Sequence, residues 1–325
     1  MPPIHASAPT RIDLAGGTLD LWPLYLLVPD CVTVNLAIDL RARVRVEPRR
    51  DSRRVLRSHD TGETADMADG GGNLPLLRAV ARAVPTATGF ALSTRAAVPP
   101  GSGLGGSSSL AVAALRGLSA FRGRPMVLSR VLAVARDLEA EVIRVPTGNQ
   151  DHVAAAHGGL AAVRFRAGGF RREVIRTDLA ELGRRLALVL VGQSRLSADT
   201  NWRMLRAAVD GDGGTLARFG RIAAAARAMR EALSAGDLPA AAAAMEREYD
   251  ARRGLVAGVE TAEMAEVHAA ARAAGALAGK VCGAGGGGGM VFLVPPDRRN
   301  AVLAATREAG ARPLAFRPDP EGVTP

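Results

Sequence analysis

The chain has 325 residues, 48% of them hydrophobic, which is enough to bury the core of one large domain or two medium ones. Its formal charge is +10, but 41 of the 42 basic residues are scattered arginines and only 3% of residues are aromatic, so we expect no nucleic-acid partner. Two cysteines are too few for a disulfide framework, and the sequence shows neither a signal peptide nor a membrane-spanning apolar run. We therefore expect a cytoplasmic protein with no membrane partner.

The first third of the chain predicts mostly strands. Ala8–Asp20 alternates polar and apolar residues before a glycine pair, which predicts a strand that enters a turn. Cys31–Arg49 is rich in β-branched residues and favours a long strand, or a strand pair, with one wet face. We expect a second strand pair over Arg53–Met67, a short helix over Asn73–Val84 that Asn73 caps, and a strand over Phe90–Val98.

The stretch Pro99–Leu110 has four glycines followed by three serines, between a predicted strand and an apolar run. Glycines remove Cβ atoms, and the serines are candidate N-caps for the next helix. Backbone N–H groups and the helix dipole converge there, which predicts an anion site for a nucleotide polyphosphate. A Walker A loop is excluded, because valine follows the only lysine, Lys280. The dinucleotide fingerprint matches weakly, because no acidic residue follows about 20 positions later.

The rest of the chain predicts helices and a few buried strands. Composition alone allows Glu139 and Asp151 to be solvated surface carboxylates, each at the end or start of a helix. Five glycines, 285–289, run straight into an apolar strand, which a flexible linker would not do. The elements expected are helices over 126–143, 216–235, 238–255, 261–274 and 297–310, a helix opened by the turn 145–152, and strands over 160–165, 186–191, 290–294 and 313–316.

Three of these stretches together resemble the motifs of the GHMP kinases, which include galactokinase, homoserine kinase, mevalonate kinase and phosphomevalonate kinase. Ala8–Asp20 is similar to Ala-Pro-x-Arg-x-x-Leu-x-Gly-Gly-x-x-Asp, in the form used by heptose-phosphate and fucose kinases. Pro99–Ser108 is similar to Pro-x-x-x-Gly-Leu-Gly-Ser-Ser-Ser/Ala, with Gly106 in place of one serine. Lys280–Gly288 is similar to Lys-x-x-Gly-Ala-Gly-Gly-Gly-Gly. The motifs stand in family order, and the resemblance covers about residues 8–295.

The resemblance implies ATP and Mg²⁺ as cofactors. Mg²⁺ prefers a few hard oxygen ligands, which the Ser107 hydroxyl and the Glu139 carboxylate can supply. Glu139 precedes Asp151 by twelve residues, as in heptose-kinase-like members, and Glu141 misses this spacing. The residues implied to hold the nucleotide are Pro100, Gly101, Ser102, Gly103, Leu104, Gly105, Gly106, Ser107 and Ser108.

The resemblance also implies catalytic and substrate-binding residues. Asp151 would face the acceptor hydroxyl as a general base, and Arg11 beside it would keep the carboxylate ionised by lowering its pKa. A loose transition state leaves open whether Asp151 removes the proton or only orients the hydroxyl. Arg195 suits a substrate phosphate, although a surface helix cap explains it equally well. The substrate-binding residues implied are Gly17, Thr18, Asp20, Arg195, Lys280, Gly283, Ala284 and Gly285; His152 and His157 are interpreted as structural.

The fold implied is the two-domain α/β (α+β) GHMP kinase fold, as a monomer or homodimer. Residues 1–180 would form an N-terminal domain with a mixed sheet and the phosphate loop, and residues 181–325 a C-terminal domain of helices on an antiparallel, ferredoxin-like sheet. We hypothesise a small-molecule kinase that transfers the γ-phosphoryl group of ATP to a hydroxyl of a sugar or sugar phosphate, with heptose 7-phosphate as the leading substrate. The alternatives are a mevalonate-type or other alcohol kinase, a catalytically silent nucleotide-binding regulator and, more remotely, a dinucleotide oxidoreductase.

Overall fold

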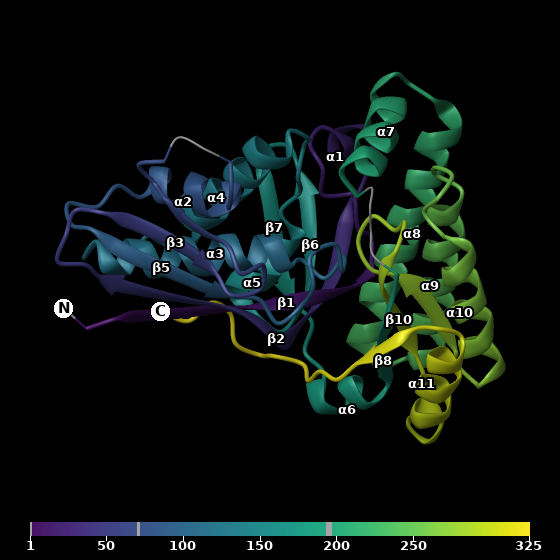
Figure 1. Ribbon diagram of the computed structural model, residues 1–325. Coiled ribbons are helices and arrows are strands. Elements are labelled where there is room, and N and C mark those ends of the chain that lie inside the picture. Colours follow the sequence, from purple (N-terminus) through teal and green to yellow (C-terminus); the bar gives the residue numbers. More distant parts are fainter. Residues whose placement is uncertain (1, 70–71, 193–196) are drawn as a thin grey trace.

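The computed structural model describes residues 2–69, 72–192 and 197–325, which are arranged around two β-sheets (Figure 1). Within these residues, the sheet formed by the first half of the chain has seven strands, and the other has four. The first sheet consists of β1 (Ile4–Ala15), β2 (Val32–Pro48), β3 (Arg54–Ser58), β4 (Thr64–Asp66), β5 (Phe90–Arg95), β6 (Leu160–Arg166) and β7 (Gly169–Val174). The helices of this half are α1 (Leu24–Leu27), α2 (Pro75–Ala83), α3 (Gly106–Phe121), α4 (Leu128–Ile143), α5 (Gln150–His157) and α6 (Leu179–Arg184).

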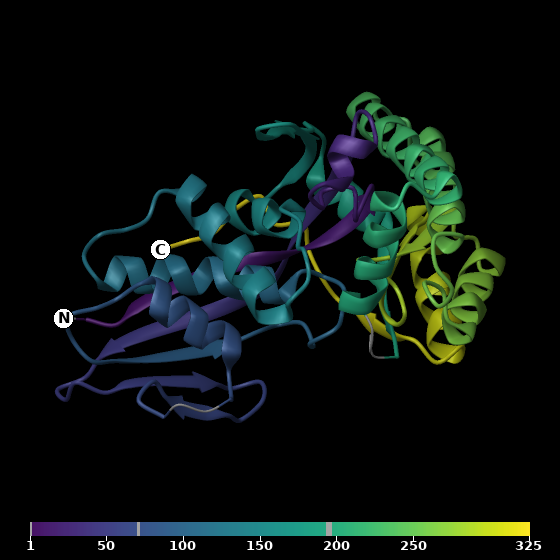
Figure 2. The same cartoon turned by 90° about the horizontal axis from the view of Figure 1, so that it is seen from above.

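The first sheet is mixed, as predicted. Its strand order is β4-β3-β5-β2-β6-β7, β1 pairs along most of β2, and β3 runs parallel to β5. In the second half of β2, Val44 and Val46 are buried whereas Arg43 and Arg45 are exposed, so one face is wet and the other faces the core. Figure 2 shows the helices α2 to α5 gathered on one side of this sheet.

The second sheet is antiparallel, with strand order β11-β8-β10-β9, and this prediction is also confirmed. Three of its helices begin where a side-chain oxygen of Asp212, Asp237 or Thr261 accepts a backbone N–H of the first turn. The elements of this half are β8 (Leu186–Val191), α7 (Ser197–Val209), α8 (Gly213–Ala235), α9 (Leu238–Arg253), α10 (Ala262–Ala273), β9 (Ala278–Val281), β10 (Gly288–Leu293), η1 (Pro296–Arg298), α11 (Arg299–Glu308) and β11 (Arg312–Leu314).

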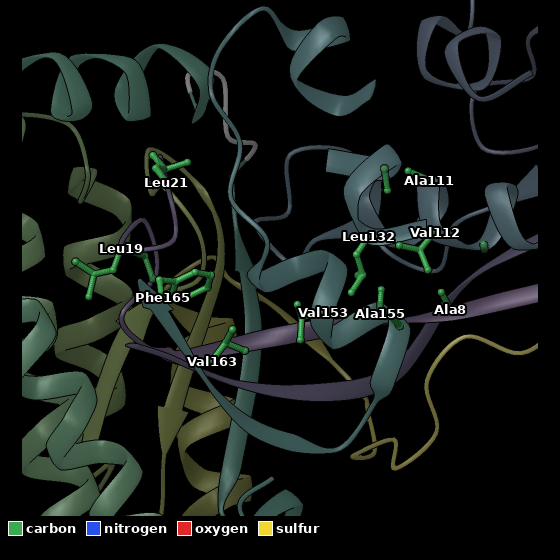
Figure 3. Packing of buried hydrophobic residues seen from close by; sticks show 14 of the residues in the cluster. Ala8, Leu19, Leu21, Ala111, Val112, Leu132, Val153, Ala155, Val163 and Phe165 are labelled. Carbon is green, nitrogen blue, oxygen red and sulfur yellow. The ribbon is translucent and has the colours of Figure 1, made fainter. Parts of the chain in front are cut away.

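Small buried side chains hold the helices α3 and α5 close to the first sheet. In Figure 3, Ala111 and Val112 of α3 and Val153 and Ala155 of α5 lie over the strands, near Ala8 of β1. All five are at most 1% exposed. Because a close-packed core leaves helices little freedom to shift, the first residues of α3 and α5 are fixed relative to β1.

The end of the chain returns to the first half of the molecule. After β11 it runs back so that the two termini lie near each other (Figure 1). The Thr324 backbone N–H donates to the Ser7 carbonyl at 2.9 Å, and Asp319 forms an ion pair with Arg41. The chain passes from the first sheet to the second between β7 and β8, on either side of residue 180, and the domain boundary at that residue stays a prediction. The last residues of the chain nevertheless pack on the N-terminal half.

Some local predictions are wrong. Asn73 is not a helix cap, because α2 begins at Pro75 and Leu74, at φ 60°, occupies the N-cap position. The strand from Phe90 ends at Arg95 instead of Val98, because the next backbone N–H, of Ala96, donates to the Asp60 carboxylate. The spacing of Trp202 and Met204 predicts two packing residues, and Met204 is buried, but Trp202 is 45% exposed. The short elements β7 and α6 were not predicted. In the described part of the chain, no helix is long and apolar enough to cross a membrane.

Candidate active site

The glycine loop leads directly into α3 and lies against the third glycine-rich motif. Gly101, Gly103 and Gly105 all adopt left-handed backbone angles, with φ between 70° and 74°. A Cβ on Gly103 would lie 2.3 Å from the Cys282 carbonyl oxygen, so a side chain at this position would collide with the backbone of the third motif. The Gly289 backbone N–H donates to the Ser102 carbonyl at 2.7 Å. The two motifs are therefore held together through their backbones.

The start of α3 is not capped by a serine, which corrects the sequence-based expectation. The N-cap residue is Gly105, and no side chain of the described residues caps the helix. The hydroxyls have other partners: Ser108 donates to Glu139 at 2.7 Å and Ser109 to the Pro9 carbonyl at 2.7 Å. A helix start without a side-chain cap, at the end of a glycine loop, has the geometry that binds phosphate.

Asp151 and Arg11 form the ion pair at the centre of the site. Asp151 is in the first turn of α5, and its Oδ1 lies 2.6 Å from Nη2 of Arg11 on β1. The same guanidinium donates from Nη1 to the Gly103 carbonyl at 2.5 Å. Burial lowers the pKa of Arg11, but the charges of Asp151 and Asp13 and the hydrogen bond to Asp151 together raise it above the ordinary value, so the arginine stays charged. Asp151 remains 24% exposed, which leaves its carboxylate open to a ligand.

Glu139 on α4 is buried beside the loop serines. Besides the Ser108 hydroxyl, its Oε2 lies 3.0 Å from Nε2 of His152. Burial would raise the pKa of Glu139, but His152 and the hydroxyls of Ser107 and Ser108 outweigh it and lower the pKa to about 2. Glu139 is thus an ionised hard oxygen ligand next to a hydroxyl, which fits Mg²⁺ shared with nucleotide phosphates. Within the described residues, no cluster of three or more His, Cys, Asp or Glu could hold a metal alone.

Asp20 closes the acceptor side of the site. Its side chain is 3% exposed, and its Oδ2 accepts the Gln150 backbone N–H at 2.9 Å. Burial raises the pKa of Asp20 to about 6, because the effect of burial outweighs that of the hydrogen bond, which lowers the pKa. A Cβ on Gly148 would lie 1.7 Å from this carboxylate, so only glycine allows the loop before α5 to approach it so closely.

Two cavities meet at Asp151. One, of about 260 Å³, is called the acceptor cavity below, and its lining includes Thr18, Asp20, Gly283 and Ala284. The other, of about 510 Å³, is lined by the glycine loop and by the apolar segment 74–77 at the start of α2. The residues that line both cavities are Gly103, Gly105, Ser107, Glu139 and Asp151. A nucleotide on one side and an acceptor on the other would thus meet at Asp151 and Glu139.

Lys280 does not line the acceptor cavity, which corrects its assignment as a substrate-binding residue. It is fully buried, with Nζ 2.9 Å from Asp13 Oδ2 and 3.5 Å from Glu248 Oε1. Arg252 completes this cluster, donating to the Gly17 carbonyl at 2.6 Å and pairing with Glu248. The cluster therefore lies behind the Gly16–Thr18 turn and fixes it to α9 and β9.

The remaining predicted site residues are placed as follows. Gly285 packs against the Val259 carbonyl oxygen, 2.3 Å from where its Cβ would be, and is not among the residues of the acceptor cavity. Arg195 lies outside the described residues. His152 is fully buried and contacts Glu139, consistent with a structural role.

The sequence does not predict two residues at or near the acceptor cavity. Asn201 of α7 lines the cavity, and Arg252 of α9 supports the Gly17 turn. Neither carries a distinctive signal, because both stand in helices rich in alanine and arginine, far from the glycine motifs. The Glu248–Arg252 pair has the i,i+4 spacing that is common on solvated helix faces.

Comparisons with known proteins agree with this arrangement. Residues 74–159 match the family description "GHMP kinases N terminal domain" and residues 229–312 match "GHMP kinases C terminal". The D-glycero-alpha-D-manno-heptose 7-phosphate kinase of Campylobacter jejuni is 28% identical over 99% of this chain and 98% of that protein. The mevalonate kinase of Thermococcus sibiricus is 26% identical over 98% of this chain and 97% of that protein.

A solved structure shows the same fold. The D-glycero-D-manno-heptose 1-phosphate kinase from Bacteriodes thetaiotaomicron superposes with a TM-score of 0.78 and 22% identity, over 98% of this chain and 97% of that one. At that identity the likeness establishes the fold alone. The two family matches together span more than half of the chain, with one match in each half. The chain therefore belongs to the GHMP kinases and is an ATP-dependent phosphotransferase with a hydroxyl group as acceptor.

Proposed function

We propose that this chain transfers the γ-phosphoryl group of ATP to a hydroxyl of a sugar or sugar phosphate, with D-glycero-D-manno-heptose 7-phosphate as the leading acceptor. One observation carries the proposal: two cavities on either side of the glycine loop share Asp151 and Glu139. The full-length likeness to a heptose 7-phosphate kinase supports the choice of sugar. Phosphoryl transfer requires a hydroxyl held in line with the γ-phosphorus, and this arrangement permits it.

The nucleotide lies in the larger cavity, with its phosphates against the loop and the start of α3. The apolar side chains of the segment 74–77 face the same cavity and suit an apolar nucleobase surface. Glu139 and the Ser107 hydroxyl would hold Mg²⁺, which would supply positive charge to neutralise the nucleotide phosphates. The Glu139 carboxylate is already ionised at neutral pH, because its pKa is about 2, so it need not lose a proton to bind Mg²⁺.

The acceptor hydroxyl donates its hydrogen bond to Asp151. Arg11 holds that carboxylate in place through two contacts, of 2.6 and 2.8 Å, and ties it to the loop through the Gly103 carbonyl. The proton of the hydroxyl passes to Asp151 as the hydroxyl oxygen bonds to the γ-phosphorus, and the bond from the γ-phosphorus to the β–γ bridging oxygen breaks, so that ADP leaves. Thr18, Asp20, Gly283 and Ala284 line the acceptor cavity, and the Asp20 carboxylate accepts hydrogen bonds from sugar hydroxyls.

The test is ATP consumption with Mg²⁺ against a panel of heptose 7-phosphate, free hexoses, fucose, homoserine and mevalonate. We expect turnover on one sugar or sugar phosphate. Turnover on mevalonate alone would replace the proposal with a mevalonate-type kinase, and tight ATP binding without turnover on any acceptor would favour a silent regulator. The cytoplasmic setting and the monomeric or dimeric state stay predictions.

A further inference from the structure

Two side-chain amides in the acceptor cavity have no hydrogen-bond partner among the residues that the structure describes. The buried oxygens of Gln150 and Asn201 accept no hydrogen bond from the described residues, and no bond in that part of the chain engages either amide group. Gln150 is only 7% exposed, and its backbone N–H is held by Asp20, so the residue is fixed while its amide is free. A buried amide without a partner costs free energy, which a bound ligand can recover.

The two amides come from different halves of the molecule. Gln150 is the first residue of α5, directly before Asp151, and Asn201 lies on α7, after the change of sheet. Both residues line the same cavity of about 260 Å³. A ligand that contacts both therefore spans the two halves while its reacting end lies at Asp151.

The charge of the cavity limits which ligand can do this. Its described lining contains the carboxylates of Asp20, Glu139 and Asp151, and Arg11 is the one arginine or lysine in it. Arg11 is already paired with Asp151. A carboxylate placed among these groups would be repelled, whereas a hydroxyl can donate to them. A half-turn of an amide exchanges its oxygen and nitrogen, so each amide can match a hydroxyl as donor or acceptor.

We propose that Gln150 and Asn201 are specificity-determining residues that bind hydroxyls remote from the reacting one, so that the cavity selects a neutral polyhydroxyl segment of the acceptor. This inference rests on the proposed function. On this inference, two neutral amides and the acidic lining together make the cavity prefer a sugar to a carboxylate-bearing alcohol such as mevalonate.

The experiment compares Asn201→Leu and Gln150→Met, which keep the side-chain size but remove the amide, with Asn300→Leu on the exposed face of α11 as the control. Heptose 7-phosphate is the probe, and the KM values for sugar and ATP are measured separately. We expect the sugar KM to rise about tenfold in each cavity variant, with the ATP KM and the control unchanged. A monodeoxy analogue that lacks the hydroxyl bound by one amide should have a higher KM than the intact sugar with the native protein. With the variant that lacks this amide, the analogue and the intact sugar should have the same KM.

A binding measurement without ATP separates the two proposals. The chain has two tryptophans, Trp22 and Trp202, each next in sequence to a residue of the cavity lining, so intrinsic fluorescence can report sugar binding. Native protein that binds and phosphorylates the sugar, while both variants bind it as tightly, would overturn this inference and leave the proposed function standing. Mevalonate that competes with the sugar as an equal ligand would also overturn it. Native protein that turns over no sugar would defeat both.

Discussion

Two ion-pair clusters lie two residues apart on β1 and differ in their access to ligand. Arg11 pairs with Asp151, which remains 24% exposed in the cleft. Asp13 pairs with Lys280 in a cluster that includes Glu248 and Arg252, all of them fully buried. The first cluster has an open carboxylate oxygen between two cavities, whereas the second balances two positive against two negative charges inside the protein.

Under the proposed function, this difference separates a carboxylate that contacts the acceptor from groups that only position the backbone. A buried, balanced cluster has no face for a substrate, but it can hold a turn in one place, as Arg252 does through the Gly17 carbonyl. Asp151 has the accessibility that a hydroxyl acceptor needs, and Arg11 keeps it oriented. Substitutions in the first cluster should therefore act on turnover, and substitutions in the second on stability.

The largest expected effect is that of Asp151→Asn. The amide cannot accept the proton and loses the charge that pairs with Arg11, so we expect kcat to fall by about 10²- to 10⁴-fold. The melting temperature should fall less than in the Lys280→Met variant below, because the Asp151 side chain is partly exposed and Arg11 keeps its hydrogen bond to the Gly103 carbonyl. Asp137→Asn, on the exposed face of α4, is the matched control and should keep full activity. Equal turnover in the native protein and Asp151→Asn would exclude Asp151 as the base.

Lys280→Met tests the second cluster. It removes the 2.9 Å partner of the buried Asp13 and leaves the cluster with one uncompensated negative charge, while Glu248 keeps its pair with Arg252. We therefore expect the free energy of unfolding to fall by about 3–5 kcal/mol in urea denaturation. Adding Asp13→Asn should restore part of the loss, because it removes one uncompensated charge. An unchanged unfolding curve with a raised acceptor KM would instead return Lys280 to the substrate site.

The sequence predicts the site residues that stand in family motifs, and misses those that stand outside any motif. The glycine loop, Arg11, Glu139 and Asp151 were found because their spacings follow family motifs, and the structure brings them together. Lys280 stands in such a motif, yet whether its side chain faces the cleft or the interior depends on Glu248, 32 residues earlier on α9. Asn201 and the returning chain end are likewise set by long-range contacts that carry no local pattern.

Asp20 links the acceptor site to stability through its pKa of about 6, which burial raises from the ordinary 3.8. The folded protein thus holds the proton more tightly than the unfolded chain, so this contribution to stability is full at low pH and is lost as pH rises through 6. Asp20→Asn should increase the free energy of unfolding at pH 8 by on the order of 2–3 kcal/mol, with little change at pH 4.

The same variant should raise the acceptor KM, and it should remove the rise in KM that we expect for the native protein below pH 6. Urea denaturation at the two pH values and a KM profile from pH 5 to 8 measure both effects. A stability difference that does not vary with pH would show that Asp20 does not titrate in this range.

The smallest effect is expected for Glu139→Gln. Mg²⁺ would keep nucleotide oxygens and water among its ligands, so losing one carboxylate should raise the Mg²⁺ concentration for half-maximal rate by about tenfold without abolishing turnover. Glu141→Gln is a close control on the same helix, because Glu141 is 56% exposed and pairs with Arg82 on the surface. Two residues of separation on α4 thus distinguish a buried ligand from a surface charge, and equal Mg²⁺ dependence in the two variants would remove Glu139 from the metal site.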